Sequence, residues 1–131
     1  MTMGDVTGCR VFVVEDETLI AVLIEDILVG MECKIVGPIG KLETALQLAR
    51  DEPFDIAILD VTIRGGTVYP VAEQLIKRGI PFVLASGYGD WALPPSLRDQ
   101  RRLMKPFTAA ALEEQVRLLC VEAGRPGKAD R

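Results

Sequence analysis

Reactive polar residues stand at the ends of apolar, β-branched segments of the sequence. Glu15 and Asp16 follow the first such segment, Asp60 the third, Ser86 the fourth and Lys105 the fifth. If the first and third segments are neighbouring strands, three carboxylates gather in one crevice, where like charges raise a pKa or attract a cation. Oxygen ligands that are few and open to water suit Mg²⁺, and Mg²⁺ accompanies phosphate chemistry.

The other strand-end residues fit a phosphoryl group bound beside such a cation. Lys105 supplies a compact positive charge for phosphoryl oxygens, and the Ser86 hydroxyl donates a further hydrogen bond. The remaining carboxylate, Asp60, is then available as a nucleophile that forms an acyl phosphate.

These residues must be positioned by alternating strands and helices. Strands are expected at residues 11–14, 34–36, 55–59, 81–85 and 103–104. Helices are expected after the first strand with a stop at Gly30, at 42–49, at 71–76 with a stop at Gly79, and after a cap at Thr108. Residues 87–100 contain two glycines and two prolines, so a helix there should be short or mobile. Near-continuous apolar strands separated by helices predict a parallel α/β sheet, whose functional site lies beyond the carboxyl ends of the strands.

Composition sets the class of protein. The chain has 131 residues, 49% of them hydrophobic, which is enough for one domain with one core. Its net charge of −4 argues against nucleic acid binding, and the absence of histidine excludes Ser-His-Asp and Cys-His catalysis. No apolar run approaches the roughly 20 residues of a membrane span. Three widely spaced cysteines, Cys9, Cys33 and Cys120, are typical of core residues in a reducing cytoplasm, so the protein is expected to be cytoplasmic, with no membrane partner.

Four motifs, in order, resemble the receiver domain of two-component response regulators. They are Val13-Val14-Glu15-Asp16-Glu17, Ile58-Leu59-Asp60-Val61, Leu84-Ala85-Ser86-Gly87-Tyr88 and Met104-Lys105-Pro106-Phe107, and the resemblance covers about residues 9–122. The third motif and the loop of residues 60–66 also resemble the FATGUY subgroup, with Leu84 and Ser86 in place of its Phe and Thr.

The resemblance implies a single doubly wound domain of the flavodoxin-like, CheY-like class, with five parallel strands in the order 2-1-3-4-5. It implies that Asp60 accepts a phosphoryl group from the phosphohistidine of a sensor histidine kinase or phosphotransfer protein. Asp16, Asp60 and the Thr62 backbone carbonyl would bind Mg²⁺ directly, and Glu15 would assist through water. Ser86 and Lys105 would bind the phosphoryl group. Such a protein is a phosphoacceptor that assists its own phosphorylation and dephosphorylation, and is not otherwise an enzyme.

Two positions depart from the usual receiver pattern. Arg102 stands three residues before the lysine, where many receivers carry a switch aromatic, and Arg64 stands where a proline is common. Signalling is therefore expected to run through the Ser86 loop and residues 87–100, with a downstream protein target binding the face of residues 87–120. The expected organisation is an N-terminal extension at 1–8, a stand-alone receiver domain at 9–123 and a disordered tail at 124–131.

Three other functions fit part of the pattern. A haloacid dehalogenase-like phosphatase also uses a strand-end aspartate and Mg²⁺, but it expects a second aspartate where Thr62 stands. A flavodoxin-like cofactor binder should carry a Ser/Thr/Gly-rich loop where this chain has Glu15 and Asp16. A degenerate receiver would bind partners without phosphorylation, which the complete set of site residues disfavours.

Overall fold

The fold is a three-layer α/β sandwich around one parallel sheet. The computed structural model describes residues 6–87 and 93–124. The strands are β1 (Arg10–Val14), β2 (Lys34–Ile39), β3 (Ile56–Asp60), β6 (Phe82–Ser86) and β7 (Arg101–Met104), in the order β2-β1-β3-β6-β7. All four pairings are parallel, as predicted.

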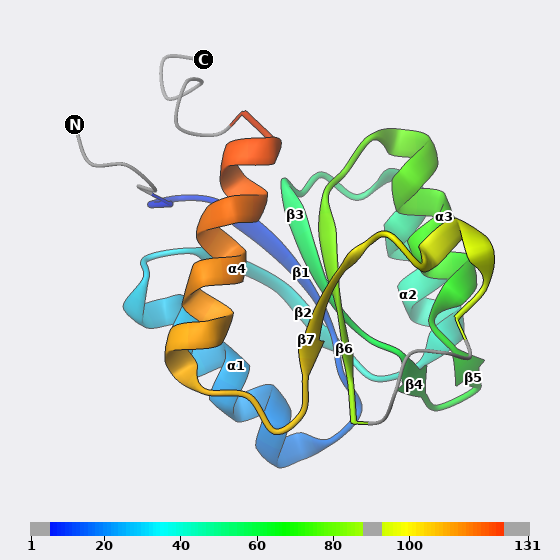
Figure 1. Cartoon of the computed structure of the whole chain (residues 1–131), viewed down its shortest axis with the longest axis horizontal. Coiled ribbons are helices and arrows are strands. Elements are labelled where there is room, and N and C mark those ends of the chain that lie inside the picture. Colours follow the sequence, from blue (N-terminus) through cyan, green and yellow to red (C-terminus); the bar gives the residue numbers. More distant parts are fainter. Residues whose placement is uncertain (1–5, 88–92, 125–131) are drawn as a thin grey trace.

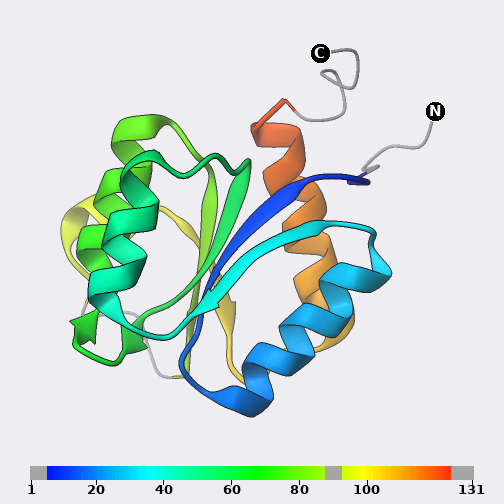
Figure 2. The same cartoon turned by 180° about the vertical axis from the view of Figure 1, so that it is seen from behind.

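Helices cover both faces of the sheet. One face carries α1 (Thr18–Gly30) and α4 (Ala109–Glu122), and the other carries α2 (Leu42–Asp51) and α3 (Tyr69–Arg78) (Figures 1 and 2). Alternate β1 residues feed the two resulting cores: Phe12 and Val14 pack toward α2 and α3, whereas Val11 and Val13 pack toward α1 and α4. The predicted fold class is confirmed. The predicted strand order is confirmed too: β4 and β5 form a separate hairpin, and when only the five sheet strands are numbered along the chain their order is 2-1-3-4-5.

The helix boundary signals are also confirmed. The Thr108 hydroxyl accepts a hydrogen bond of 3.0 Å from the Ala111 backbone N–H, which caps α4. Gly79 adopts the left-handed conformation that ends α3. Among the described residues, no helix is both long and apolar enough to cross a membrane.

The predicted end of the second strand is wrong. The strand was expected to stop at Val36, but β2 continues through Gly37 and Pro38 to Ile39. It can do so because β2 lies at the edge of the sheet, where a proline without an N–H is tolerated. The register shifts between Phe12 and Val14, and Gly37 takes a φ of 109° at this bulge.

Two other segments differ in detail from the prediction. The expected loop after β3 contains a small antiparallel hairpin, β4 (Thr62–Ile63) and β5 (Gly66–Thr67). The described part of the 87–100 segment carries one short 3₁₀ turn, Pro95–Leu97, in agreement with a short helix, and residues 88–92 lie outside the described residues.

The predicted domain limits at residues 9 and 123 remain predictions. Val6 lies before the first limit, yet it is buried in the core shared with α1 and α4. Residues 1–5 and Tyr88 lie outside the described residues. So do residues 125–131, which make up most of the predicted tail.

Candidate functional site

The carboxyl ends of the sheet strands surround a cavity of about 350 Å³. Its lining residues come from the ends of β1, β3, β6 and β7 and from the segments that follow them: Asp16, Glu17, Asp60, Val61, Thr62, Ser86, Gly87 and Lys105. Five of the six residues predicted for the site therefore line one cavity. The sixth, Glu15, contacts the lining residue Lys105.

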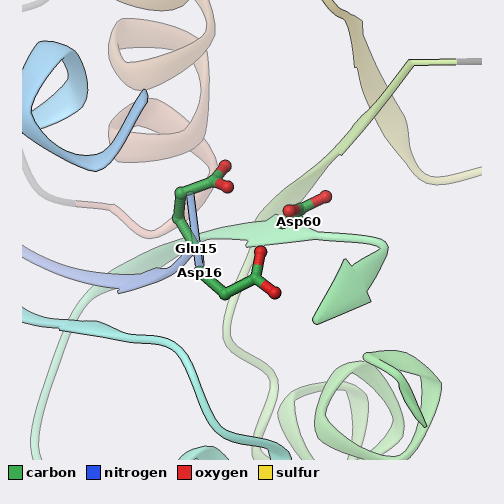
Figure 3. A group of neighbouring side chains, drawn as sticks. All are labelled: Glu15, Asp16 and Asp60. Atoms are coloured by element: carbon green, nitrogen blue, oxygen red, sulfur yellow. The ribbon is translucent and has the colours of Figure 1, made fainter. Parts of the chain in front are cut away.

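Three carboxylates, from the end of β3 and from the two residues directly after β1, lie close together (Figure 3). β1 and β3 pair in parallel with Val14 opposite Leu59, so Glu15, directly after β1, and Asp60, the last residue of β3, lie at the same edge of the sheet. One carboxylate oxygen each from Glu15, Asp16 and Asp60 lies within 4.8 Å of the others. Glu15 is 3% and Asp60 7% exposed, whereas Asp16 is half-buried. An all-oxygen donor set with one open side fits Mg²⁺.

Lys105 bridges two of these carboxylates. Its Nζ lies 3.0 Å from Glu15 Oε1 and 3.2 Å from Asp60 Oδ2. The Lys105 backbone N–H donates to the Ser86 carbonyl at 2.8 Å, which holds the ends of β6 and β7 together. Burial lowers the pKa of Lys105, but the hydrogen bond to Glu15 and the charge of Asp60 outweigh it and raise the pKa overall.

The pKa of Glu15 is raised above its ordinary value. Burial raises its pKa, and the negative charge of Asp60 adds to that rise. The Glu17 backbone N–H donates to Glu15 Oε2 at 3.1 Å and Lys105 donates to Oε1, and both bonds lower the pKa. The net pKa of Glu15 is above the ordinary value, so the ionised form of Glu15 depends on the nearby Lys105 ammonium.

Asp60 both lines the cavity and contacts the Lys105 ammonium. It is the last residue of β3, it faces the cavity, and its Oδ1 accepts a hydrogen bond of 3.4 Å from the Thr62 backbone N–H. Its Oδ2 contacts the Lys105 ammonium. Ser86 is half-buried at the end of the neighbouring strand β6, so a group bonded to Asp60 would meet a cation and a hydroxyl.

Glu17 also belongs to the site, although it was not among the predicted site residues. Its side chain is exposed, but the residue lines the cavity and its backbone N–H donates to Glu15. Its position directly after Glu15 and Asp16 in the first motif was the available signal.

Comparisons with known proteins identify the family. No protein-family model matches the chain. It is 30% identical over an alignment of 113 residues to the transcriptional regulatory protein PdtaR of Mycobacterium tuberculosis, and the match covers 83% of this chain. The match covers 55% of PdtaR, so the chain spans about half the length of that relative. Among solved structures, it is 36% identical to SdrG of Sphingomonas melonis, covering 94% of this chain and 98% of SdrG with a TM-score of 0.73.

The fold also matches the receiver domain of the sensor histidine kinase PA1611 of Pseudomonas aeruginosa, with a TM-score of 0.72 at 19% identity over 90% of this chain and 99% of that one. The chain belongs to the response regulator receiver family. The PA1611 domain holds a magnesium ion in its active site cleft. The receiver resemblance carried by the four motifs is thus confirmed, and two-component signalling is the function of this family.

Proposed function

We propose that the receiver domain is a phosphoaspartyl switch, with Asp60 as the residue that accepts the phosphoryl group from a histidine kinase or phosphotransfer protein. The observation that carries the proposal is the position of Asp60, nearly buried between the Lys105 ammonium and two further carboxylates at an open cavity. An Asp60 oxygen attacks phosphorus as the bond to the partner's histidine nitrogen breaks, and the imidazole leaves with the bonding pair.

The chain's own residues prepare this transfer. Lys105, which contacts Asp60, offers its ammonium to the incoming phosphoryl oxygens, and the Ser86 hydroxyl donates from the neighbouring strand end. Asp16, Asp60 and the Thr62 carbonyl would hold Mg²⁺, with Glu15 assisting through water. A bound Mg²⁺ neutralises charge that develops on the phosphoryl oxygens. The protein is then a phosphoacceptor and not an enzyme with a separate substrate.

The first two turns of α1 offer a docking surface for the kinase. This helix begins two residues after Asp16, and residues 18–24 carry no charge. Leu19 is 84% exposed, and Val22 and Leu23 are exposed beside it. An exposed apolar patch at the rim of the site suits the apolar face of a histidine-bearing helix, because docking there brings the two reacting side chains together.

The output is proposed to use the Ser86 loop. Ser86 lines the cavity and belongs to the sequence motif Leu84-Ala85-Ser86-Gly87-Tyr88, which resembles the FATGUY subgroup, to which we assign the chain. Arg102 pairs with Leu84 across β6 and β7 in place of the usual aromatic. The downstream protein would bind the face of residues 87–120, in the cytoplasm. Amide hydrogen exchange over residues 87–100 should slow with beryllofluoride and Mg²⁺, and an unchanged profile would refute this route.

The phosphoacceptor is tested with small phosphoryl donors and analogues. Acetyl phosphate with Mg²⁺ should add one phosphoryl group to the wild type, and beryllofluoride with Mg²⁺ should shift amide resonances around the cavity. Asp60→Asn should abolish both responses, whereas Asp51→Asn, an exposed aspartate at the end of α2, should keep them. A wild type with neither a mass gain nor a Mg²⁺-dependent shift would overturn the proposal.

A further inference from the structure

Two cysteine thiols lie side by side at the end of the sheet opposite to the acidic cavity. Cys9 precedes β1 directly, and Cys120 lies in the last turn of α4. Their Sγ atoms are 3.0 Å apart although 111 residues separate them in sequence, and both residues are fully buried. The half-buried Cys33 thiol instead donates to the Val6 carbonyl at 3.7 Å.

The two sulfur atoms already lie close to disulfide bonding distance. A disulfide needs an Sγ–Sγ distance of about 2.05 Å, so the two atoms must approach by only about 1 Å. The Cys9 N–H donates to Val6 and its carbonyl accepts from Lys34, while Cys120 is held in the helix. Closing the bond therefore needs a movement of only about 1 Å once one thiol has been oxidised and α4 has closed again. We propose that Cys9 and Cys120 are a redox modification site that forms a reversible intramolecular disulfide.

A peroxide is a sufficient oxidant. The thiolate of one cysteine attacks the O–O bond and becomes a sulfenic acid, with release of one water after proton transfer. The second thiol attacks that sulfur and expels the oxygen as another water. Two thiols and one hydrogen peroxide thus give one disulfide and two waters, and a dithiol reductant reverses the reaction by exchange.

The position of the pair determines how fast it reacts and what it changes. Both thiols are shielded from solvent, so oxidation requires opening of the last turn of α4, a helix end that opens more easily than the sheet. The crosslink then ties α4 to the start of β1. It lies at the opposite end of β1 from Glu15 and Asp16, so it should stabilise the fold and restrain α4 without altering the acidic cavity.

The experiment treats the full chain with hydrogen peroxide, alkylates the remaining thiols, and maps peptides without reduction. We expect a mass loss of two hydrogens, one alkylated cysteine at Cys33, and a crosslinked peptide joining Cys9 to Cys120. The midpoint of thermal unfolding should rise by roughly 10 °C and return with dithiothreitol. The response to beryllofluoride should be unchanged, which separates this test from that of the phosphoacceptor.

Variants and a denaturant series complete the test. Cys33→Ser should keep the crosslink and the thermal shift, and Cys120→Ser and Cys9→Ala should each lose both. Low urea concentrations that loosen the end of α4 should accelerate the reaction. A crosslink that includes Cys33 or joins two chains would overturn the proposal. So would three alkylated thiols in the wild type after peroxide, with and without urea.

Discussion

Replacing Lys105 with methionine tests whether this ammonium neutralises the buried acidic cluster. Methionine keeps the length and most of the packing of the lysine stem but removes the charge. The lysine side chain is 14% exposed, and its Nζ contacts carboxylates of Glu15 and Asp60 whose side chains are 1% and 9% exposed. The variant therefore leaves two nearly buried carboxylates, and the adjacent Asp16, without their cation.

The size of the effect depends on pH because a buried carboxylate that has lost its cation can take up a proton and become neutral. Removing one partner of a buried ion pair costs about 3–5 kcal/mol. Protonation limits that cost: for Glu15, with an ordinary pKa of 4.5, holding a proton at pH 7.5 costs about 4 kcal/mol and at pH 5.5 about 1.4 kcal/mol. We therefore expect Lys105→Met to lower the free energy of unfolding by about 3–4 kcal/mol at pH 7.5 and by about 1–1.5 kcal/mol at pH 5.5.

The sign follows from proton linkage. Burial raises the folded-state pKa of Glu15, so between its ordinary value and that raised value the folded protein holds more protons than the unfolded chain. Stability contributed by this group consequently falls as the pH rises through that window. Loss of the Lys105 hydrogen bond raises the pKa of Glu15 further, which widens the window and steepens the dependence in the variant.

The assay is urea unfolding followed by far-UV circular dichroism at the two pH values. Lys77→Met, at an exposed position of α3, serves as the matched control and should change stability by less than about 0.5 kcal/mol. Added Mg²⁺ should restore more stability to Lys105→Met than to the wild type. A loss that is equal at both pH values, or smaller than about 1 kcal/mol at pH 7.5, would refute the reasoning.

Three further changes probe the fold and the docking surface. Gly37→Ala should destabilise the protein by about 2–3 kcal/mol in urea unfolding, because φ is 109° and a Cβ would lie 2.7 Å from the Val13 carbonyl oxygen. Gly30→Ala, with open space around it, is the control and should not destabilise the protein. Thr108→Ala should cost about 1 kcal/mol in the same assay through the lost cap. Leu19→Glu should slow phosphotransfer from a cognate kinase at least tenfold, which corresponds to about 1.4 kcal/mol, without affecting modification by acetyl phosphate. Val29→Glu, at the far end of α1, should leave both reactions unchanged. Equal phosphotransfer rates for Leu19→Glu and the wild type would exclude this face as the docking surface.

Sequence patterns located the buried strands better than the edges of the sheet. β3 is buried at all five positions, so its apolar run was unambiguous. β7 is an edge strand that begins with two arginines, and the apolar pattern recovered only residues 103–104 of Arg101–Met104. Arg101 pairs with Glu122 of α4, a contact 21 residues away that no local pattern contains. The β4–β5 hairpin was missed for a similar reason, since its two-residue strands carry no periodicity.

The site residues could be predicted from the sequence because parallel strands place their carboxyl ends at one edge of the sheet. Which carboxylates form ion pairs with Lys105 could not be predicted in this way. Strand-end position alone gathers Glu15, Asp16 and Asp60, and it does not tell which of them Lys105 contacts. That choice arises from the β6–β7 pairing, which aligns Ser86 with Met104 and so places the next residue, Lys105, beside the cluster. The cation then reaches the two carboxylates that are nearly buried and leaves the half-buried Asp16 facing the cavity. Lys105 thus contacts the two nearly buried carboxylates, and Asp16, the most exposed of the three, offers the open side through which a metal ion would enter.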